Sequence, residues 1–356
     1  MQSFALPSWA QAIVPVTAIS VLLIFGNSWG AIAAVVGMLL GQILNLAIVV
    51  FALNRYGLSL RPRWKGNLSH HEMLRSFATQ YLPLVAAALF IALAQPIGNV
   101  MASSLASGSI GALNLGNKIV LFVTGLIGTA IATAILPHFS AYLARNRKLE
   151  VRRELSFFML TGTALAMPVS IACFMAAKPL ALLAFGSAEV GDADIETVAR
   201  VIKFGIIQLP VFTCYILLLR FAAASHRSGF VMLLSLVGLA LNIALSLLLM
   251  GHMGVAGISL AATLALGVSA FLMLITLHRL GDVPWVEVVM IALCWTLFFT
   301  LMLCLHYHSH AGTVVAGMGI ALLLIGYWHE AAGHGRLVNR VALIAKASSP
   351  AHGHAN

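Results

Sequence analysis

The chain has 356 residues, of which 61% are hydrophobic and only 8% are charged, and it carries a formal net charge of +10. Its mean hydropathy is +1.00, which excludes an ordinary soluble globular domain of this length. The positive charge does not indicate a nucleic-acid-binding protein, because the basic residues are divided among short loops instead of lining one face.

Apolar stretches separated by short polar or Gly/Pro-containing breaks recur along the chain. A helix of about twenty apolar residues crosses the roughly 30 Å hydrocarbon core of a bilayer. The stretches cover approximately residues 8–25, 29–53, 77–102, 110–136, 155–177, 198–221, 230–250, 255–277, 285–305 and 313–328. They predict an all-α polytopic membrane protein with about ten transmembrane helices.

Most of the basic residues between these stretches lie in two loops, one after the second stretch and one after the fourth. Cytoplasmic loops of bacterial membrane proteins hold an excess of lysine and arginine, so both loops are expected on the cytoplasmic side. Continuing the alternation places both termini in the cytoplasm and the protein in the bacterial inner membrane. The residues are Arg55, Arg61, Arg63, Lys65 and Arg75 in the first loop and Arg145, Arg147, Lys148, Arg152 and Arg153 in the second.

Pro83, Pro96, Pro168 and Pro210 lie inside predicted spans. Proline lacks a backbone N–H and kinks a helix, which a membrane tolerates where neighbours or a wet cavity satisfy the freed carbonyls. Each proline by itself is equally consistent with an ordinary packing kink. The four together favour a protein that changes conformation.

Residues that could perform catalysis or hold a metal are sparse. His306, His308 and His310 alternate in a short predicted outer loop, but no carboxylate or cysteine accompanies them, so no metal site is predicted. The sequence has no nucleophile elbow, H-E-x-x-H or P-loop motif. We therefore expect neither an enzyme nor a bound cofactor.

Polar residues inside the third and fourth stretches form the candidate site. Lys118 lies in the fourth stretch with Asn114 and Asn117 close by, and Gln95 and Asn99 of the third stretch could face them. An ionisable side chain inside a membrane is costly unless it is paired or hydrated. A lysine that lines a hydrated cavity would attract an anionic substrate such as a phosphate or diphosphate. The alternative is that Lys118 snorkels to the outer interface as an anchor.

Several segments match one known family in order. The run MASSLASGSIGALNLGNKIVLFVTGLIGTAIATAILPHFS (101–140), which ends in Leu-Pro-x-x-Ser, is the most specific. KPLALLAFG (178–186), LLRFAAASHRSG (218–229) and MGVAGISLAAT (253–263) follow it. With these segments the chain resembles, over nearly its whole length, the MviN/MurJ lipid II flippases of the multidrug/oligosaccharidyl-lipid/polysaccharide exporter superfamily.

The resemblance implies a two-lobe exporter fold. Residues 1–65 would be the last two helices of an incomplete first lobe, and residues 66–281 the complete second lobe of six helices. Residues 282–330 would be two helices of a groove for the lipid tail, and residues 331–356 a cytoplasmic polar tail. Because the family's first four helices have no counterpart here, we expect a fragment, a truncated product, or a partner chain that supplies them.

The resemblance also implies an activity, namely outward movement of the undecaprenyl-diphosphate-linked precursor lipid II by alternating access. The partners would be this glycan precursor and membrane lipid, with no nucleic acid. Lys118, where the family has a cavity arginine, would hold the diphosphate, and Asn114, Asn117, Gln95 and Asn99 would meet the polar head. Two alternatives stay open: a flippase for another polyprenyl-linked glycan, such as an O-antigen or exopolysaccharide unit, and a truncated, non-transporting remnant or scaffold.

Overall fold

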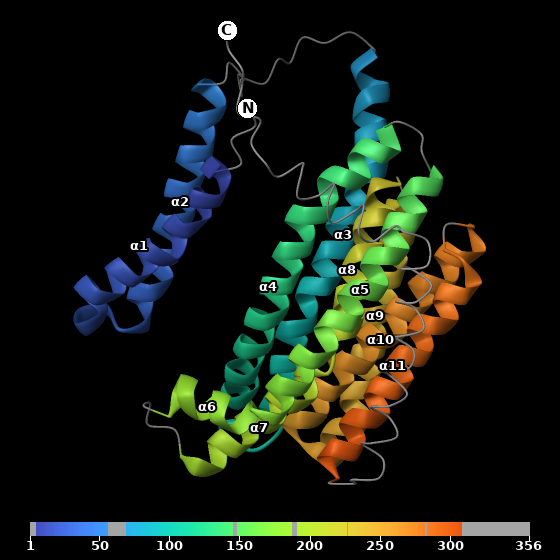
Figure 1. Ribbon diagram of the computed structural model, residues 1–356. Coiled ribbons are helices and arrows are strands. Elements are labelled where there is room, and N and C mark those ends of the chain that lie inside the picture. Colours follow the sequence, from blue (N-terminus) through green and yellow to red (C-terminus); the bar gives the residue numbers. More distant parts are fainter. Residues whose placement is uncertain are drawn as a thin grey trace, which may run out of the picture. The chain divides into compact units, whose positions relative to one another are not determined.

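The computed structural model describes residues 5–55, 69–144, 148–186, 191–225, 227–281 and 283–307, and these are almost entirely helical (Figure 1). The helices are α1 (Ala5–Trp29), α2 (Ala31–Arg55), α3 (Ser69–Ser103), α4 (Ser109–Ala144), α5 (Lys148–Met175), α6 (Ala177–Phe185), α7 (Asp192–Ile206), α8 (Leu209–Ala224), α9 (Ser228–Met253), α10 (Val255–Arg279) and α11 (Trp285–His306). Glycines with positive φ, Gly30 and Gly254, join α1 to α2 and α9 to α10, where the chain reverses. The predicted all-helical polytopic class is confirmed.

The chain divides into two compact units, residues 1–74 and residues 75–356. The first unit holds α1 and α2, and the second holds most of α3 and the helices from α4 to α11. The functional boundaries predicted after residues 65, 281 and 330 stay predictions.

The first unit is a helical hairpin held by close contact between two backbones. A side-chain carbon added at Gly37 would lie 2.8 Å from the Cα of Ala18, and one added at Gly41 would lie 2.8 Å from the Cα of Val14. Ala33, one turn earlier on α2, is fully buried. Small residues at four-residue spacing let membrane helices approach this closely. The hairpin therefore packs through a small-residue face of α2.

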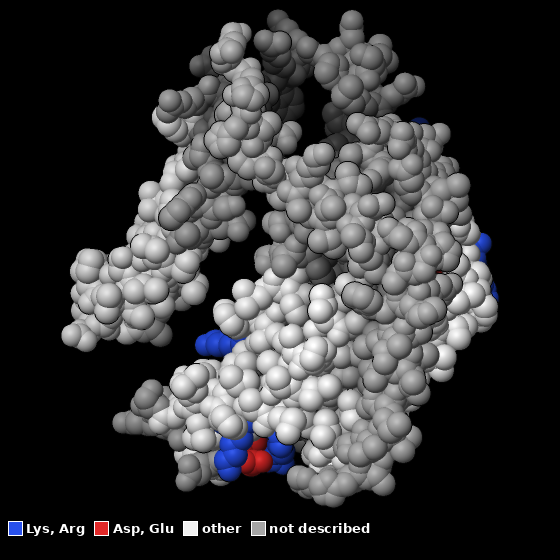
Figure 2. Space-filling view, in the orientation of Figure 1, with Lys and Arg blue, Asp and Glu red and all other residues white. Residues whose placement is uncertain are grey.

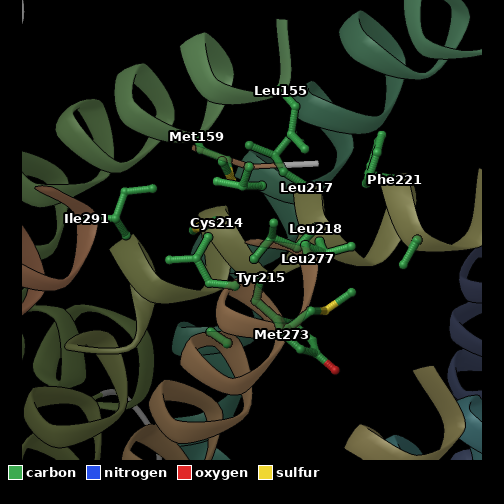
Figure 3. Packing of buried hydrophobic residues seen from close by; sticks show 14 of the residues in the cluster. Leu155, Met159, Cys214, Tyr215, Leu217, Leu218, Phe221, Met273, Leu277 and Ile291 are labelled. Atoms are coloured by element: carbon green, nitrogen blue, oxygen red, sulfur yellow. The ribbon is translucent and has the colours of Figure 1, made fainter. Parts of the chain in front are cut away.

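The second unit has its largest hydrophobic core cluster around α8. Figure 3 shows buried side chains of this cluster converging from α5, α8, α10 and α11. Those labelled are Leu155, Met159, Cys214, Tyr215, Leu217, Leu218, Phe221, Met273, Leu277 and Ile291. α8 contacts α4, α5, α9 and α10, so this cluster joins several helices of the unit.

In the described part of the chain, seven helices are long and apolar enough to span a membrane, namely α2, α3, α4, α5, α9, α10 and α11. The pair α7 and α8 would make an eighth span, bent by 47° at a break. The prediction of one continuous helix over residues 198–221 is therefore wrong, and the short helix α6 has no predicted counterpart. The predicted stretch 313–328 lies outside the described residues.

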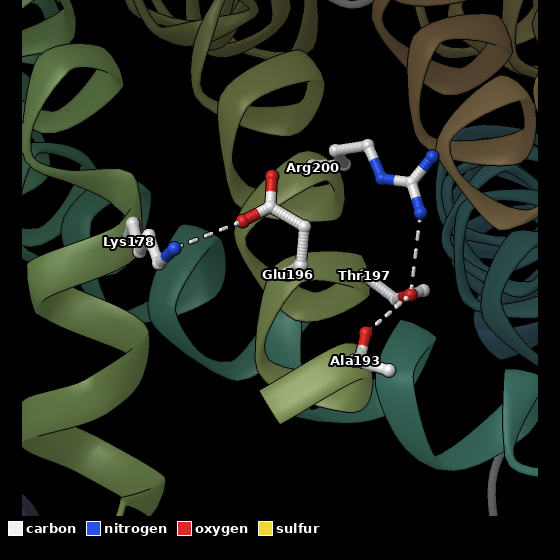
Figure 4. Close-up of polar contacts among 5 residues, drawn as sticks. All are labelled: Lys178, Ala193, Glu196, Thr197 and Arg200. Atoms are coloured by element: carbon white, nitrogen blue, oxygen red, sulfur yellow. Dashed lines mark hydrogen bonds and ion pairs between the residues drawn. The ribbon is translucent and has the colours of Figure 1, made fainter. Parts of the chain in front are cut away.

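Charged side chains gather at the end of the second unit where α6 and α7 lie, as the blue and red group in Figure 2 shows. Nζ of Lys178 on α6 lies 3.5 Å from Oε2 of Glu196 on α7 (Figure 4). Arg200 points away from this pair and donates to the hydroxyl of Thr197 on its own helix. The ion pair thus links α6 to α7 at an exposed end of the unit.

Candidate functional site

The second unit contains a cavity of about 330 Å³ bordered by α3, α4, α8, α9, α10 and the break before α8. Small-molecule sites in proteins commonly have volumes of about 300–1,000 Å³. The described residues that line it include no charged side chain, and their polar side chains are all neutral amides or hydroxyls. These are Gln95, Asn117, Gln208, Tyr215, Ser235, Asn242, Ser259 and Ser269.

Two of the five residues predicted for the site border this cavity, Gln95 of α3 and Asn117 of α4. Gln95 also donates from Nε2 to Oδ1 of Asn114 on α4, at a distance of 3.5 Å. This is a weak hydrogen bond at the upper limit of distance. It nevertheless shows that polar residues of α3 and α4 face each other beside the cavity.

Lys118 and Asn99 do not border the cavity. Lys118 follows Asn117 on α4, but successive helical residues point about 100° apart, and its side chain is exposed. Asn99 is half-buried, and its Oδ1 has no hydrogen-bond partner among the described residues. The structure therefore brings Gln95, Asn117 and Asn114 together and leaves the other two outside this group. The binding roles predicted for all five stay predictions.

The break between α7 and α8 lies beside the cavity, because Gln208, one of its two residues, is part of the cavity wall. Pro210, in the first turn of α8, explains the position of the break. It has no N–H to donate to the carbonyl of Ile206, four residues earlier. The hydroxyl of Ser170 on α5 donates to this carbonyl instead, at 2.8 Å.

Two further hydroxyls satisfy carbonyls near the end of α7. Ser259 of α10 donates to the carbonyl of Val201 at 3.0 Å, and Thr263 of α10 donates to that of Phe204 at 2.8 Å. The carbonyl of Phe204 is among the last four of α7, which lack partners within the helix, and inside a membrane such a group needs a donor from elsewhere. The break is thus stabilised by side chains of α5 and α10, which are remote from it in sequence.

Most residues of the cavity wall were not predicted from the sequence. Ser235 and Asn242 lie seven residues apart on α9 and therefore share one face of this largely apolar helix. This spacing was a usable signal for α9. Gln208 gave no such signal, because it lies between two helices whose separation the apolar pattern did not predict.

Comparison with known proteins identifies one family. Residues 1–341 match the family described as lipid II flippase MurJ. A Helicobacter pylori (strain ATCC 700392 / 26695) protein named probable lipid II flippase MurJ is 28% identical over 262 residues, covering 69% of this chain and 56% of that protein. A protein of the same name from Rhizobium meliloti (strain 1021) is 24% identical over 268 residues, covering 72% of this chain and 47% of that protein. The chain thus spans about half the length of these curated relatives.

Solved structures share the fold. The lipid II flippase MurJ in its inward closed conformation matches with a TM-score of 0.64 and 15% identity, covering 92% of this chain and 67% of that one. A mutant of the Vibrio cholerae MATE transporter VcmN matches with a TM-score of 0.61 and 15% identity, covering 77% of this chain and 62% of that one. At such identities the likeness shows the fold alone, and it confirms the predicted exporter architecture.

Proposed function

The chain belongs to the MurJ family of lipid II flippases, and from this membership we propose that it moves an undecaprenyl-diphosphate-linked peptidoglycan precursor across the inner membrane by alternating access. It is a multi-pass membrane transporter of this family and not an enzyme. The complete flippase activity is a proposal, because the chain spans about half the length of its curated relatives.

The observation that supports this proposal most is a neutral polar cavity with a cation beside its wall. Asn117 borders the cavity, and the next residue, Lys118, presents its ammonium group on the exposed side of α4. A lipid-linked diphosphate likewise joins an anionic group to an uncharged sugar. In this proposal Lys118 binds the diphosphate, and the amides of Gln95, Asn99 and Asn114, with that of Asn117, meet the polar head.

The broken helix supports the alternating-access part of the proposal. α7 and α8 are two rigid segments that meet at residues 207–208, so a change of angle there would move α7 relative to the core around α8. The hydroxyls of Ser170, Ser259 and Thr263 hold one arrangement of this break. Such hydrogen bonds can exchange partners at small energetic cost, because each contributes only about 0.6 kcal/mol in a membrane.

The orientation in the membrane belongs to the same proposal, with both termini in the cytoplasm. Gly191 precedes α7 and Arg279 ends α10. A membrane-impermeant thiol reagent should label a Gly191→Cys variant only from the periplasmic side and an Arg279→Cys variant only from the cytoplasmic side. Labelling of Gly191→Cys from the cytoplasmic side would overturn the orientation.

Lys118 provides the test of the proposed function. The chain is reconstituted in liposomes with fluorescent lipid II, and arrival of the label in the opposite leaflet is measured. A charge-assisted hydrogen bond contributes about 1.5–3 kcal/mol, so Lys118→Ala should weaken precursor binding and lower transport by about tenfold or more. Lys118→Arg should transport at least as well as the unmodified chain, since its forked guanidinium suits a diphosphate.

The matched control is Lys178→Ala, which removes another exposed lysine whose partner is Glu196. This variant should transport normally. If Lys118→Ala transports as well as the unmodified chain at equal protein abundance, Lys118 is an interfacial anchor and not a ligand of the diphosphate. If the unmodified chain moves a different polyprenyl-linked glycan but not lipid II, the proposed substrate is wrong.

A further inference from the structure

The cavity of the second unit is suited to an uncharged ligand. The described residues of its wall include no acid or base that could neutralise an ion. Taking an ion out of water without an opposite charge is costly, whereas a neutral hydrogen-bonding group needs only matching donors and acceptors. A cavity with this wall therefore favours neutral polar ligands over ions.

Three carboxamides supply free hydrogen-bonding capacity in the cavity. The side chains of Asn117 and Gln208 make no hydrogen bond to any residue that the structure describes, although both border the cavity. Oδ1 of Asn242 accepts a hydrogen bond from Ser246 at 3.3 Å, which leaves the amide NH₂ of Asn242 available. These carboxamides come from α4, the α7–α8 break and α9, so a ligand could contact all three segments.

The serines of the wall add acceptors. Ser235 and Ser269 each donate to a carbonyl four residues earlier on their own helix, and Ser259 donates to Val201. Their hydroxyl hydrogens are thus committed, but each oxygen keeps a lone pair. The wall therefore combines amide donors with amide and hydroxyl acceptors. A saccharide fits such a mixture, because each of its hydroxyls both donates and accepts.

Aromatic rings complete the wall. Phe90, Phe212 and Tyr215 also border the cavity. Small-molecule sites typically combine an apolar lining with a few polar groups that fix orientation. A sugar ring, with its apolar C–H faces and polar rim, meets both requirements.

We propose that this cavity is a saccharide subsite, in which the carboxamides of Asn117, Gln208 and Asn242 bind an uncharged sugar. This subsite rests on the proposed function, because the sugar would be part of the lipid-linked precursor. Lys118 would bind the diphosphate of the same precursor outside the cavity. Because Gln208 lies in the break between α7 and α8, a bound sugar contacts the point where these two segments meet. The subsite would thus select the head group and sense its presence at the break.

The test measures sugar binding separately from transport. The full chain is placed in lipid nanodiscs, and binding of N-acetylglucosamine is followed by saturation-transfer NMR, with glucosamine 6-phosphate as the charged competitor. N-acetylglucosamine should bind more tightly than the phosphorylated sugar. Gln208→Met and Asn242→Leu remove an amide at similar volume, and each should weaken binding about five- to tenfold. Thr276→Val is the matched control, because its hydroxyl bonds Leu272 of its own helix and does not border the cavity.

The outcomes separate this inference from the proposed function. Lys118→Ala should bind the sugar normally while it loses transport. The subsite is wrong if the unmodified chain does not bind N-acetylglucosamine, or if both amide variants, folded by size-exclusion chromatography, bind it as well as the control. Normal sugar binding with no transport of lipid II by the unmodified chain would overturn the proposed function and support the subsite.

Discussion

The hairpin α1–α2 and the helices α3–α11 of the second unit (the lobe) differ in whether hydroxyl groups form hydrogen bonds between helices. In the hairpin, Thr17 and Ser20 donate to carbonyls of their own helix, four residues earlier. Ser235 and Ser269 of the lobe do the same, but Ser170, Ser259 and Thr263 donate to carbonyls of a different helix. The hairpin is joined by glycines that bring two backbones together, whereas the lobe is also joined by hydrogen bonds around a broken helix.

This difference separates a part held by close backbone contact from a part that contains a cavity and a broken helix. Two continuous helices in close backbone contact leave little space for a ligand. A broken helix exposes carbonyls, places a residue such as Gln208 at a cavity, and depends on side chains of neighbouring helices. We therefore expect the hairpin to be sensitive to backbone crowding at Gly37 and Gly41. The lobe should be sensitive, in addition, to loss of a hydroxyl that bonds a neighbouring helix.

The largest effect is expected from Gly41→Ala in the hairpin. The added carbon would meet backbone atoms of Val14 at 2.8 Å, and backbone cannot rotate away as a side chain can. Overpacking of this kind costs about 1–3 kcal/mol. Disulfide crosslinking between cysteines placed on α1 and α2 should fall, and the free energy of hairpin unfolding should decrease.

Gly26→Ala is the control, because its added carbon would meet only the side chain of Leu22, at 3.7 Å. Equal behaviour of the two variants would contradict the close-packed interface.

A smaller effect is expected from Thr263→Val in the lobe. The substitution keeps the shape of the side chain but removes the donor to the carbonyl of Phe204. Hydrogen bonds between membrane helices contribute about 0.6 kcal/mol on average and up to about 1.7 kcal/mol, so thermal stability should drop accordingly. Thr263→Ser should restore it.

Thr17→Val is the matched substitution in the hairpin, where the lost hydrogen bond lies within one helix. This variant should change stability by no more than a few tenths of a kcal/mol, because the carbonyl of Ile13 keeps its ordinary helical partner. If Thr17→Val destabilises the chain as much as Thr263→Val does, the contrast between the two units is wrong. Melting curves of both variants in one detergent provide the comparison.

A similarly small effect is expected at the ion pair that links α6 to α7. The side chains of Lys178 and Glu196 are 62% and 48% exposed, so water and salt screen their attraction. Exposed pairs contribute about 0–1 kcal/mol, and a double-mutant cycle with Lys178→Ala and Glu196→Gln should give a coupling energy in the lower half of that range. The coupling should fall further in high salt. A coupling above about 1 kcal/mol would show that this pair, and not only the hydroxyls, holds α7 in place.

The sequence by itself determined the class of the protein, because long apolar runs can satisfy their backbone in a membrane only as helices. It also indicated the family, chiefly through residues 101–140. It placed Gln95 and Asn114 on helices that face each other. The packing face of the hairpin can also be read from the sequence, because Ala33, Gly37 and Gly41 recur at four-residue spacing.

Only the tertiary structure decided where the sixth apolar run breaks and what the break borders. Pro210 removes one hydrogen bond, but a helix can bend at a proline without ending, so the sequence could not choose between these outcomes. The choice depends on Ser170, Ser259 and Thr263, which are distant in sequence and reach the carbonyls of α7 only after α5 and α10 have packed. For the same reason Gln208 shares a cavity with Asn242, and the sequence around Gln208 does not predict this.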